Sequence, residues 1–132
     1  MTFRILVVDD EPDIRESLEQ ILSLSTTDTE VVTAANAKEA LAQQERKPAD
    51  LILSDYRMPG MDGLQLLAEV QKRWPGTPAI MITAYPDPQL AARAVREVGV
   101  GLFIAKPFEM EYLIDVVRSI QNGKAQKMAP HA

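Results

Sequence analysis

Short, unbroken apolar runs alternate with amphipathic stretches along almost the whole of this 132-residue chain. Leu51-Ile52-Leu53 is such a run, and the absence of polar interruptions predicts a strand that is buried on both faces. The stretches that we expect to form strands cover residues 5–8, 30–33, 50–54, 79–83 and 101–105. Strands that alternate with helices in this way indicate a parallel sheet with helices packed on both of its faces.

Several of the intervening stretches begin or end with signals typical of helices. Asn36 is a good N-cap, and Glu39 three residues later completes a pattern that resembles a capping box. Asp62-Gly63 opens another helix, and Asn122-Gly123 suits the stop of the last one. The sequence therefore predicts five helices, and a polar tail or the start of a linker over residues 123–132.

Composition excludes several classes of protein. The formal net charge of −5 disfavours a nucleic-acid-binding surface, which requires clustered Lys and Arg. The chain has no cysteine, so disulfides, thiolate metal sites and cysteine nucleophiles are excluded. Its apolar stretches are too short to span a bilayer, and its first residues lack the pattern of a signal peptide. We expect one cytoplasmic domain over residues 1–122 that contacts neither nucleic acid nor membrane.

Reactive polar residues stand at the C-terminal ends of four of the predicted strands. Asp9 and Asp10 follow the first strand, Asp55 follows the third, Thr83 is the last residue of the fourth, and Lys106 follows the fifth. Right-handed crossovers place the C-terminal ends of parallel strands at one edge of the sheet, where ligands bind in such folds. We therefore expect these five residues to converge there, although they span almost the whole chain.

The combination of residue types predicts a particular chemistry. Three converging carboxylates repel one another and require a compensating cation. Carboxylate ligands without Cys or His favour a hard ion, and Mg²⁺ fits best. With Mg²⁺ and Lys106 offsetting the negative charge, Asp55 can act as a nucleophile that forms an aspartyl-phosphate.

Each of these residues also has an ordinary structural interpretation. The segment Asp9-Asp10-Glu11-Pro12 could cap the first helix, because acidic residues and proline both suit a first turn. Asp55 could be a turn residue, Thr83 a strand residue with a local hydrogen bond, and Lys106 a solvated lysine. Their placement together at successive strand ends favours the chemical interpretation.

The order and spacing of four segments carry a family resemblance. These segments are "ILVVDDEP", "LILSDYRMPGMDGLQLL", "AIMITAY" and "LFIAKPF". Over residues 3–121 the sequence resembles the receiver domain of bacterial two-component response regulators. The resemblance implies a flavodoxin-like, doubly wound α/β fold with a five-stranded parallel sheet in the order 2-1-3-4-5 and five helices on both faces.

The resemblance also implies a role for each of the residues at the strand ends. Asp55 would be the phosphoacceptor, and it would hold Mg²⁺ together with Asp9, Asp10 and the backbone carbonyl of Arg57. The hydroxyl of Thr83 would turn inward to bond the phosphoryl group.

The remaining assignments concern the fifth strand and the segment after it. By the resemblance, Lys106 corresponds to the invariant lysine of the family, and its peptide bond to Pro107 would be cis. Phe103 falls at an aromatic switch position whose rotamer follows Thr83, although an apolar strand would also place a bulky residue there for packing.

Two positions in the pattern bear on how long a phosphoryl group would last. Arg57 stands two residues after Asp55, and Tyr85 stands two residues after Thr83. In the family these positions flank the approach of water to the aspartyl-phosphate. Two large side chains there predict slower self-dephosphorylation than alanine or glycine would give.

The implied function is a signalling switch rather than a turnover enzyme. A sensor histidine kinase or phosphotransfer protein would donate the phosphoryl group, because the one histidine here, His131, lies in the tail. The fourth helix, fifth strand and fifth helix would form the output face toward a second copy or a downstream effector. Charged residues expected on that face include Arg93, Asp115 and Arg118.

Two other functions fit parts of the pattern. A haloacid-dehalogenase-like phosphatase also uses Mg²⁺ and an aspartyl-phosphate, but it requires two aspartates separated by one residue after the first strand. Here Glu11 stands at the second of those positions. A receiver-like interaction module that is never phosphorylated is disfavoured, because every chemical residue is present.

Overall fold

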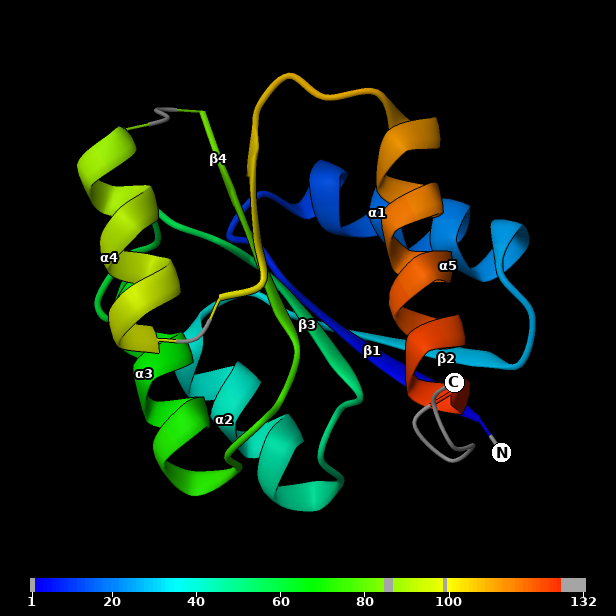
Figure 1. Cartoon of the computed structure of the whole chain (residues 1–132), viewed down its shortest axis with the longest axis horizontal. Coiled ribbons are helices and arrows are strands. Elements are labelled where there is room, and N and C mark those ends of the chain that lie inside the picture. Colours follow the sequence, from blue (N-terminus) through cyan, green and yellow to red (C-terminus); the bar gives the residue numbers. More distant parts are fainter. Residues whose placement is uncertain (1, 85–86, 99, 127–132) are drawn as a thin grey trace.

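Strands and helices alternate along the chain and build a three-layered domain (Figure 1). The computed structural model describes residues 2–84, 87–98 and 100–126. The strands are β1 (Phe3–Val8), β2 (Thr29–Ala34), β3 (Leu51–Asp55), β4 (Ala79–Thr83) and β5 (Leu102–Ala105). The helices are α1 (Pro12–Ser25), α2 (Ala37–Arg46), α3 (Gly63–Arg73), α4 (Pro88–Val98) and α5 (Met110–Gln126).

All neighbouring strands are parallel, and their order is β2-β1-β3-β4-β5. The predicted doubly wound fold is therefore confirmed. Helices α1 and α5 cover one face of the sheet, and α2, α3 and α4 cover the other (Figure 1). Because successive strand residues point to opposite faces, one continuous apolar run supplies both cores. In β1, Ile5 and Val7 face the core beneath α1 and α5, whereas Leu6 and Val8 face the other core.

The caps predicted for α2 form with one difference in detail. The side chain of Asn36 accepts a hydrogen bond from the Glu39 backbone N–H at 2.9 Å. The Glu39 carboxylate, however, accepts from the N–H of Ala35 at 2.7 Å rather than from that of Asn36 itself. A full capping box occurs instead at α3, between Asp62 and Gln65. These contacts satisfy backbone donors that a helix N-terminus otherwise leaves unpaired.

The predicted helix stop at Asn122-Gly123 is wrong, because α5 continues to Gln126. Gly123 does not adopt the left-handed conformation that ends many helices. A glycine inside a helix costs at most about 1 kcal/mol, and the Lys, Ala and Gln that follow are good helix formers. The boundary of the domain itself stays a prediction.

Arg118 does not lie on the predicted output face but contacts the end of α1. Its guanidinium donates to the backbone carbonyl of Ser25 from Nε at 3.2 Å and from Nη2 at 2.5 Å. Ser25 is the last residue of α1, whose final carbonyls have no partner within the helix. The arginine therefore caps α1 and joins it to α5.

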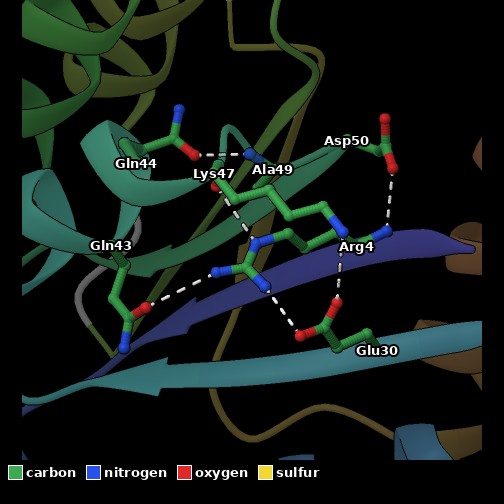
Figure 2. A network of polar contacts seen from close by, with 7 residues as sticks. All are labelled: Arg4, Glu30, Gln43, Gln44, Lys47, Ala49 and Asp50. Carbon is green, nitrogen blue, oxygen red and sulfur yellow. Dashed lines mark hydrogen bonds and ion pairs between the residues drawn. The ribbon is translucent and has the colours of Figure 1, made fainter.

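A buried arginine holds the end of α2 against the sheet. Arg4 of β1 is only 6% exposed, and Figure 2 shows its guanidinium among side chains from α2 and β2. It donates to the Lys47 carbonyl from Nε at 3.1 Å, to Glu30 from Nη1 at 2.8 Å, and to Gln43 from Nη2 at 3.4 Å. Every nitrogen of the Arg4 guanidinium group thus has an acceptor, as a buried charge requires.

Arg4→Met should lower the free energy of unfolding by about 2–3 kcal/mol, because it leaves the Lys47 carbonyl and Gln43 without a donor. The partner Glu30 is partly exposed and can be rehydrated, which limits the loss. Urea unfolding followed by circular dichroism measures the change. Arg93→Met is the matched control, because Arg93 pairs with Glu97 on the exposed surface of α4 and should contribute less than about 0.5 kcal/mol. Equal losses in the two variants would contradict this account of Arg4.

Candidate functional site

The ends of four neighbouring strands bring the predicted residues together. Val8 of β1 pairs with Ser54 of β3, so the next residue of each segment, Asp9 and Asp55, emerges at the same edge. Thr83, the last residue of β4, pairs with Ala105 of β5, and Lys106 follows directly. The backbone positions of these residues therefore meet at one edge of the sheet, as predicted.

Asp9 is held by contacts of both its side chain and its backbone. Its carboxylate accepts from the Glu11 backbone N–H at 2.9 Å through Oδ1, while Oδ2 lies 3.3 Å from the Lys106 ammonium. Its own N–H donates to the Ala34 carbonyl at 3.1 Å. Pro12 occupies the first position of α1, as the helix-capping interpretation requires. One carboxylate oxygen of Asp9 thus supports the helix start, and the other faces the cluster.

Asp55 and Lys106 form the centre of the site. The Lys106 Nζ lies 3.4 Å from Asp55 Oδ2, so one ammonium contacts the carboxylates of both Asp9 and Asp55. Asp55 is 8% exposed, so a phosphoryl donor at the edge of the sheet could still reach its carboxylate. The peptide bond between Lys106 and Pro107 is cis, as the resemblance implied.

The surroundings perturb the acid–base properties of both groups. Burial, reinforced by the charge of Asp9, raises the pKa of Asp55 despite the opposing attraction of Lys106. For Lys106, burial lowers the pKa, but the charges of Asp9 and Asp55 outweigh it and the net shift is upward. Lys106 is therefore a cation at neutral pH, and it offsets only part of the negative charge beside it.

The carboxylates of Asp9, Asp10 and Asp55 form an acidic cluster that could hold a metal ion. One carboxylate oxygen from each of Asp9, Asp10 and Asp55 lies within 4.8 Å of the others. Asp10 is exposed, whereas Asp9 and Asp55 are buried, so the cluster opens toward solvent on one side. Carboxylate oxygens with an open side suit Mg²⁺, which usually keeps several of its waters. The donor set thus fits the predicted ion.

Thr83 and Phe103 lie on the adjacent strands β4 and β5. Thr83 is 1% exposed, and its carbonyl accepts from the Lys106 backbone N–H at 2.7 Å, which ties the ends of β4 and β5 together. Phe103 is half-buried and packs against the core beneath α4. Packing therefore accounts for Phe103 in this conformation, and its switch role stays a prediction. Arg57 is exposed beside the cluster, and Tyr85 lies outside the described residues.

Gly63 is a residue whose importance the sequence reasoning missed. Its N–H donates to the Tyr56 carbonyl at 2.7 Å, and this contact draws the start of α3 onto the segment that follows β3. A Cβ at Gly63 would overlap the Asp55 carbonyl oxygen and lie 3.0 Å from the Tyr56 Cα. The available signal was a glycine at a first helical position, where a residue with a side chain is usual. Glycine therefore permits the close approach that supports the backbone of Asp55.

Asp55→Asn should stabilise the ion-free protein at neutral pH by about 1 kcal/mol, because it removes a carboxylate that burial and Asp9 disfavour. The raised pKa sets the sign. Below the ordinary value of 3.8 the carboxyl is neutral in both states, and the variants should then match. As pH rises through the folded-state pKa, the wild type should lose stability relative to Asp55→Asn. Urea unfolding in EDTA between pH 3 and 8 measures the difference, and a wild type that is more stable at neutral pH would refute it.

Solved structures of similar architecture are receiver domains. The chemotaxis protein CheY4 of Vibrio cholerae superposes with a TM-score of 0.84 at 30% identity, over 91% of this chain and 99% of that one. The receiver domain of NtrX from Brucella abortus gives a TM-score of 0.80 at 39% identity, over 88% of this chain and 96% of that one.

Related sequences lead to the same class. The hydrogenase transcriptional regulatory protein HoxA of Cupriavidus necator is 40% identical over 114 residues, which is 86% of this chain and 23% of the relative. The response regulator protein PilR of Pseudomonas aeruginosa is 40% identical over 127 residues, which is 94% of this chain and 28% of the relative. The chain thus spans about a quarter of the length of these relatives.

The fold and the clustered acids define a phosphorylation-dependent signalling domain, a class that is typically not a turnover enzyme. The model of the response regulator receiver domain matches residues 5–118, and the chain belongs to this family. The phosphatase alternative finds no support in these comparisons. Among the helices that the structure describes, none combines the length and the apolar character needed to cross a membrane.

Proposed function

We propose that Asp55 accepts a phosphoryl group from a phosphohistidine of a partner protein and that this modification switches the domain. The observation that carries the proposal is the arrangement around Asp55. Its carboxylate lies 3.4 Å from the Lys106 ammonium and shares an acidic cluster with Asp9 and Asp10. An isolated turn aspartate would need neither neighbour.

The transfer is a displacement at phosphorus. An Asp55 oxygen attacks, a P–O bond forms, and the bond to the donor imidazole nitrogen breaks as the ring leaves with the electron pair. Lys106 stabilises the negative charge of the transferring group, and the Thr83 hydroxyl bonds the phosphoryl oxygen afterward. Mg²⁺, held by Asp9, Asp10, Asp55 and the Arg57 carbonyl, would neutralise further charge on the phosphoryl oxygens.

The position of Thr83 on β4, between β3 and β5, supports the proposed switch. When Thr83 turns toward the phosphoryl group, Phe103 can repack, because the two residues lie on hydrogen-bonded strands. The population then shifts toward a second arrangement of α4, β5 and α5. Val95 of α4 and Tyr112 of α5 are large exposed apolar side chains that such a shift would reposition. This face would contact a second copy or a downstream effector.

The partners are proposed from the family. A sensor histidine kinase or phosphotransfer protein in the cytoplasm would supply the phosphoryl group. The relatives include proteins named as transcriptional regulators, among them HoxA and the DNA-binding transcriptional regulator NtrC of Salmonella typhimurium. We therefore propose that the output acts on transcription through another part of a regulator rather than through contacts of this acidic domain with DNA.

Intact-protein mass spectrometry after incubation with acetyl phosphate tests the proposal. The wild type should gain about 80 Da in the presence of Mg²⁺ and nothing in EDTA, and Asp55→Asn should gain nothing. Asp62→Asn is the matched control, because the Asp62 carboxylate caps α3 and should not be needed for labelling. Equal labelling of wild type and Asp55→Asn would refute the assignment, and an unmodified wild type would favour the unphosphorylated interaction module.

Replacing Arg57 and Tyr85 together with alanine should shorten the phosphoryl lifetime several-fold, because in the family these two positions flank the approach of water to the aspartyl-phosphate. Decay of the phosphorylated mass after removal of acetyl phosphate gives the lifetime. The single variants then separate the two positions. An unchanged lifetime in the double variant would show that neither side chain shields the aspartyl-phosphate.

A further inference from the structure

An arginine on α1 reaches back to the peptide that joins the two acidic residues after β1. Arg15 is half-buried, and its Nη1 donates to the backbone carbonyl of Asp9 at 2.7 Å. This is a charge-assisted hydrogen bond, which is shorter and stronger than one between neutral groups. The backbone N–H of Arg15 donates to the Glu11 carbonyl at 3.1 Å, so Arg15 is itself held within the first turn of α1.

The carbonyl that Arg15 contacts belongs to the peptide between Asp9 and Asp10. Because a peptide unit is planar, the direction of this carbonyl also sets the direction of the chain into Asp10. The Asp9 side chain has supports of its own in Glu11 and Lys106. Asp10 is exposed and contributes the third oxygen of the acidic cluster. The hydrogen bond from Arg15 therefore fixes the Asp9–Asp10 peptide, whose direction orients the two carboxylates relative to each other.

We propose that Arg15 is a positioning residue for the cation site, which acts by holding the Asp9–Asp10 peptide in the orientation that brings both carboxylates to one ion. This inference rests on the proposed function. Contacts of this kind behind metal ligands commonly change affinity ten-fold or more when they are lost. Arg15 itself touches neither the ion nor the phosphoryl group in this role.

A purely electrostatic role would have the opposite sign. A guanidinium that is hydrogen-bonded to the Asp9 backbone repels a divalent cation bound by the Asp9 carboxylate, so its removal would tighten Mg²⁺ binding if charge were its whole contribution. Loss of a positioning contact weakens binding instead. The sign of the change in Mg²⁺ affinity therefore separates the two roles.

The experiment is a titration of the full chain with MgCl₂, followed by amide shifts in ¹⁵N NMR spectra, for wild type, Arg15→Gln and Arg15→Lys. Arg15→Gln should raise the Mg²⁺ dissociation constant about five- to ten-fold. Arg15→Lys keeps the charge and one donor, and it should raise the constant only about two-fold. Arg118→Gln is the matched control, because that arginine also donates to a backbone carbonyl, that of Ser25 at the C-terminal end of α1. The Mg²⁺ affinity of this variant should equal that of wild type.

A second readout separates positioning from general damage to the fold. In acetyl phosphate labelling, Arg15→Gln should need more Mg²⁺ for half-maximal rate yet approach the wild-type rate at saturating Mg²⁺. Unchanged or tighter Mg²⁺ binding in Arg15→Gln would overturn the inference, and if that variant does not fold, an unchanged constant in Arg15→Lys would do so. A wild type that binds no Mg²⁺ would instead refute the proposed ion site itself.

Discussion

Lys106→Met should lower the initial rate of phosphorylation by acetyl phosphate about a hundred-fold. The lysine ammonium lies 3.3 Å from Asp9 and 3.4 Å from Asp55, where it can offset the charge that develops during transfer. Removal of one such preorganised group typically costs a factor of about 10²–10³ in rate. Methionine keeps much of the side-chain volume, so the loss reports on charge rather than on a cavity. Mass spectrometry at saturating Mg²⁺ measures the rate.

Lys47→Met provides the control for this prediction. The Lys47 ammonium lies 3.8 Å from Glu30 on the surface, remote from the acidic cluster, and its loss should leave the rate unchanged. A rate for Lys106→Met within about three-fold of wild type would show that Lys106 has no part in the transfer.

Lys106 also links stability to pH in the alkaline range. The pKa of Lys106 is raised in the folded state. The contribution of its charge to stability is therefore fully present below pH 10.5, the ordinary pKa of lysine, and is lost as the pH rises through the folded-state pKa. The difference in stability between wild type and Lys106→Met should therefore change in that range and not near neutrality.

Gly63→Ala should lower the free energy of unfolding by about 2–4 kcal/mol and should also slow phosphorylation. The added Cβ overlaps the Asp55 carbonyl oxygen, so either α3 or the end of β3 must shift. Overpacking against backbone is costly because neither neighbour can turn away as a side chain would. Urea unfolding and the labelling rate give the two effects.

Gly123→Ala is the matched substitution at a helical glycine. A Cβ at Gly123 meets nothing within 4 Å, so alanine there should stabilise α5 by up to about 1 kcal/mol. If Gly63→Ala were as stable as wild type and were labelled at the same rate, the close approach would be unimportant for the site.

The sheet and the central acids were predictable because they depend on local pattern and on chain direction. Unbroken apolar runs predicted the strands, and parallel topology then placed Asp9, Asp55, Thr83 and Lys106 at one edge. Such convergence needs no knowledge of side-chain packing, since a parallel sheet aligns the ends of all its strands.

Arg4, Arg15 and Gly63 could not be assigned in the same way. Each acts through contacts with residues outside its own helix or strand, and the hydrophobic periodicity of a sequence carries no information on such contacts. Gly63 resembled an ordinary helix start, and Arg15 an ordinary polar residue of an amphipathic helix. The end of α5 was misjudged because glycine tolerates a helical conformation as well as a left-handed one.

The most direct test of the central claim is chemical trapping of the acceptor in the wild-type protein. Borohydride reduces an aspartyl-phosphate to homoserine, which lowers the mass of that residue by about 14 Da. After treatment with acetyl phosphate and Mg²⁺, reduction and peptide mapping, we expect this change at Asp55 and at no other aspartate. The same change at Asp9, at Asp10 or elsewhere, with Asp55 unmodified, would contradict it.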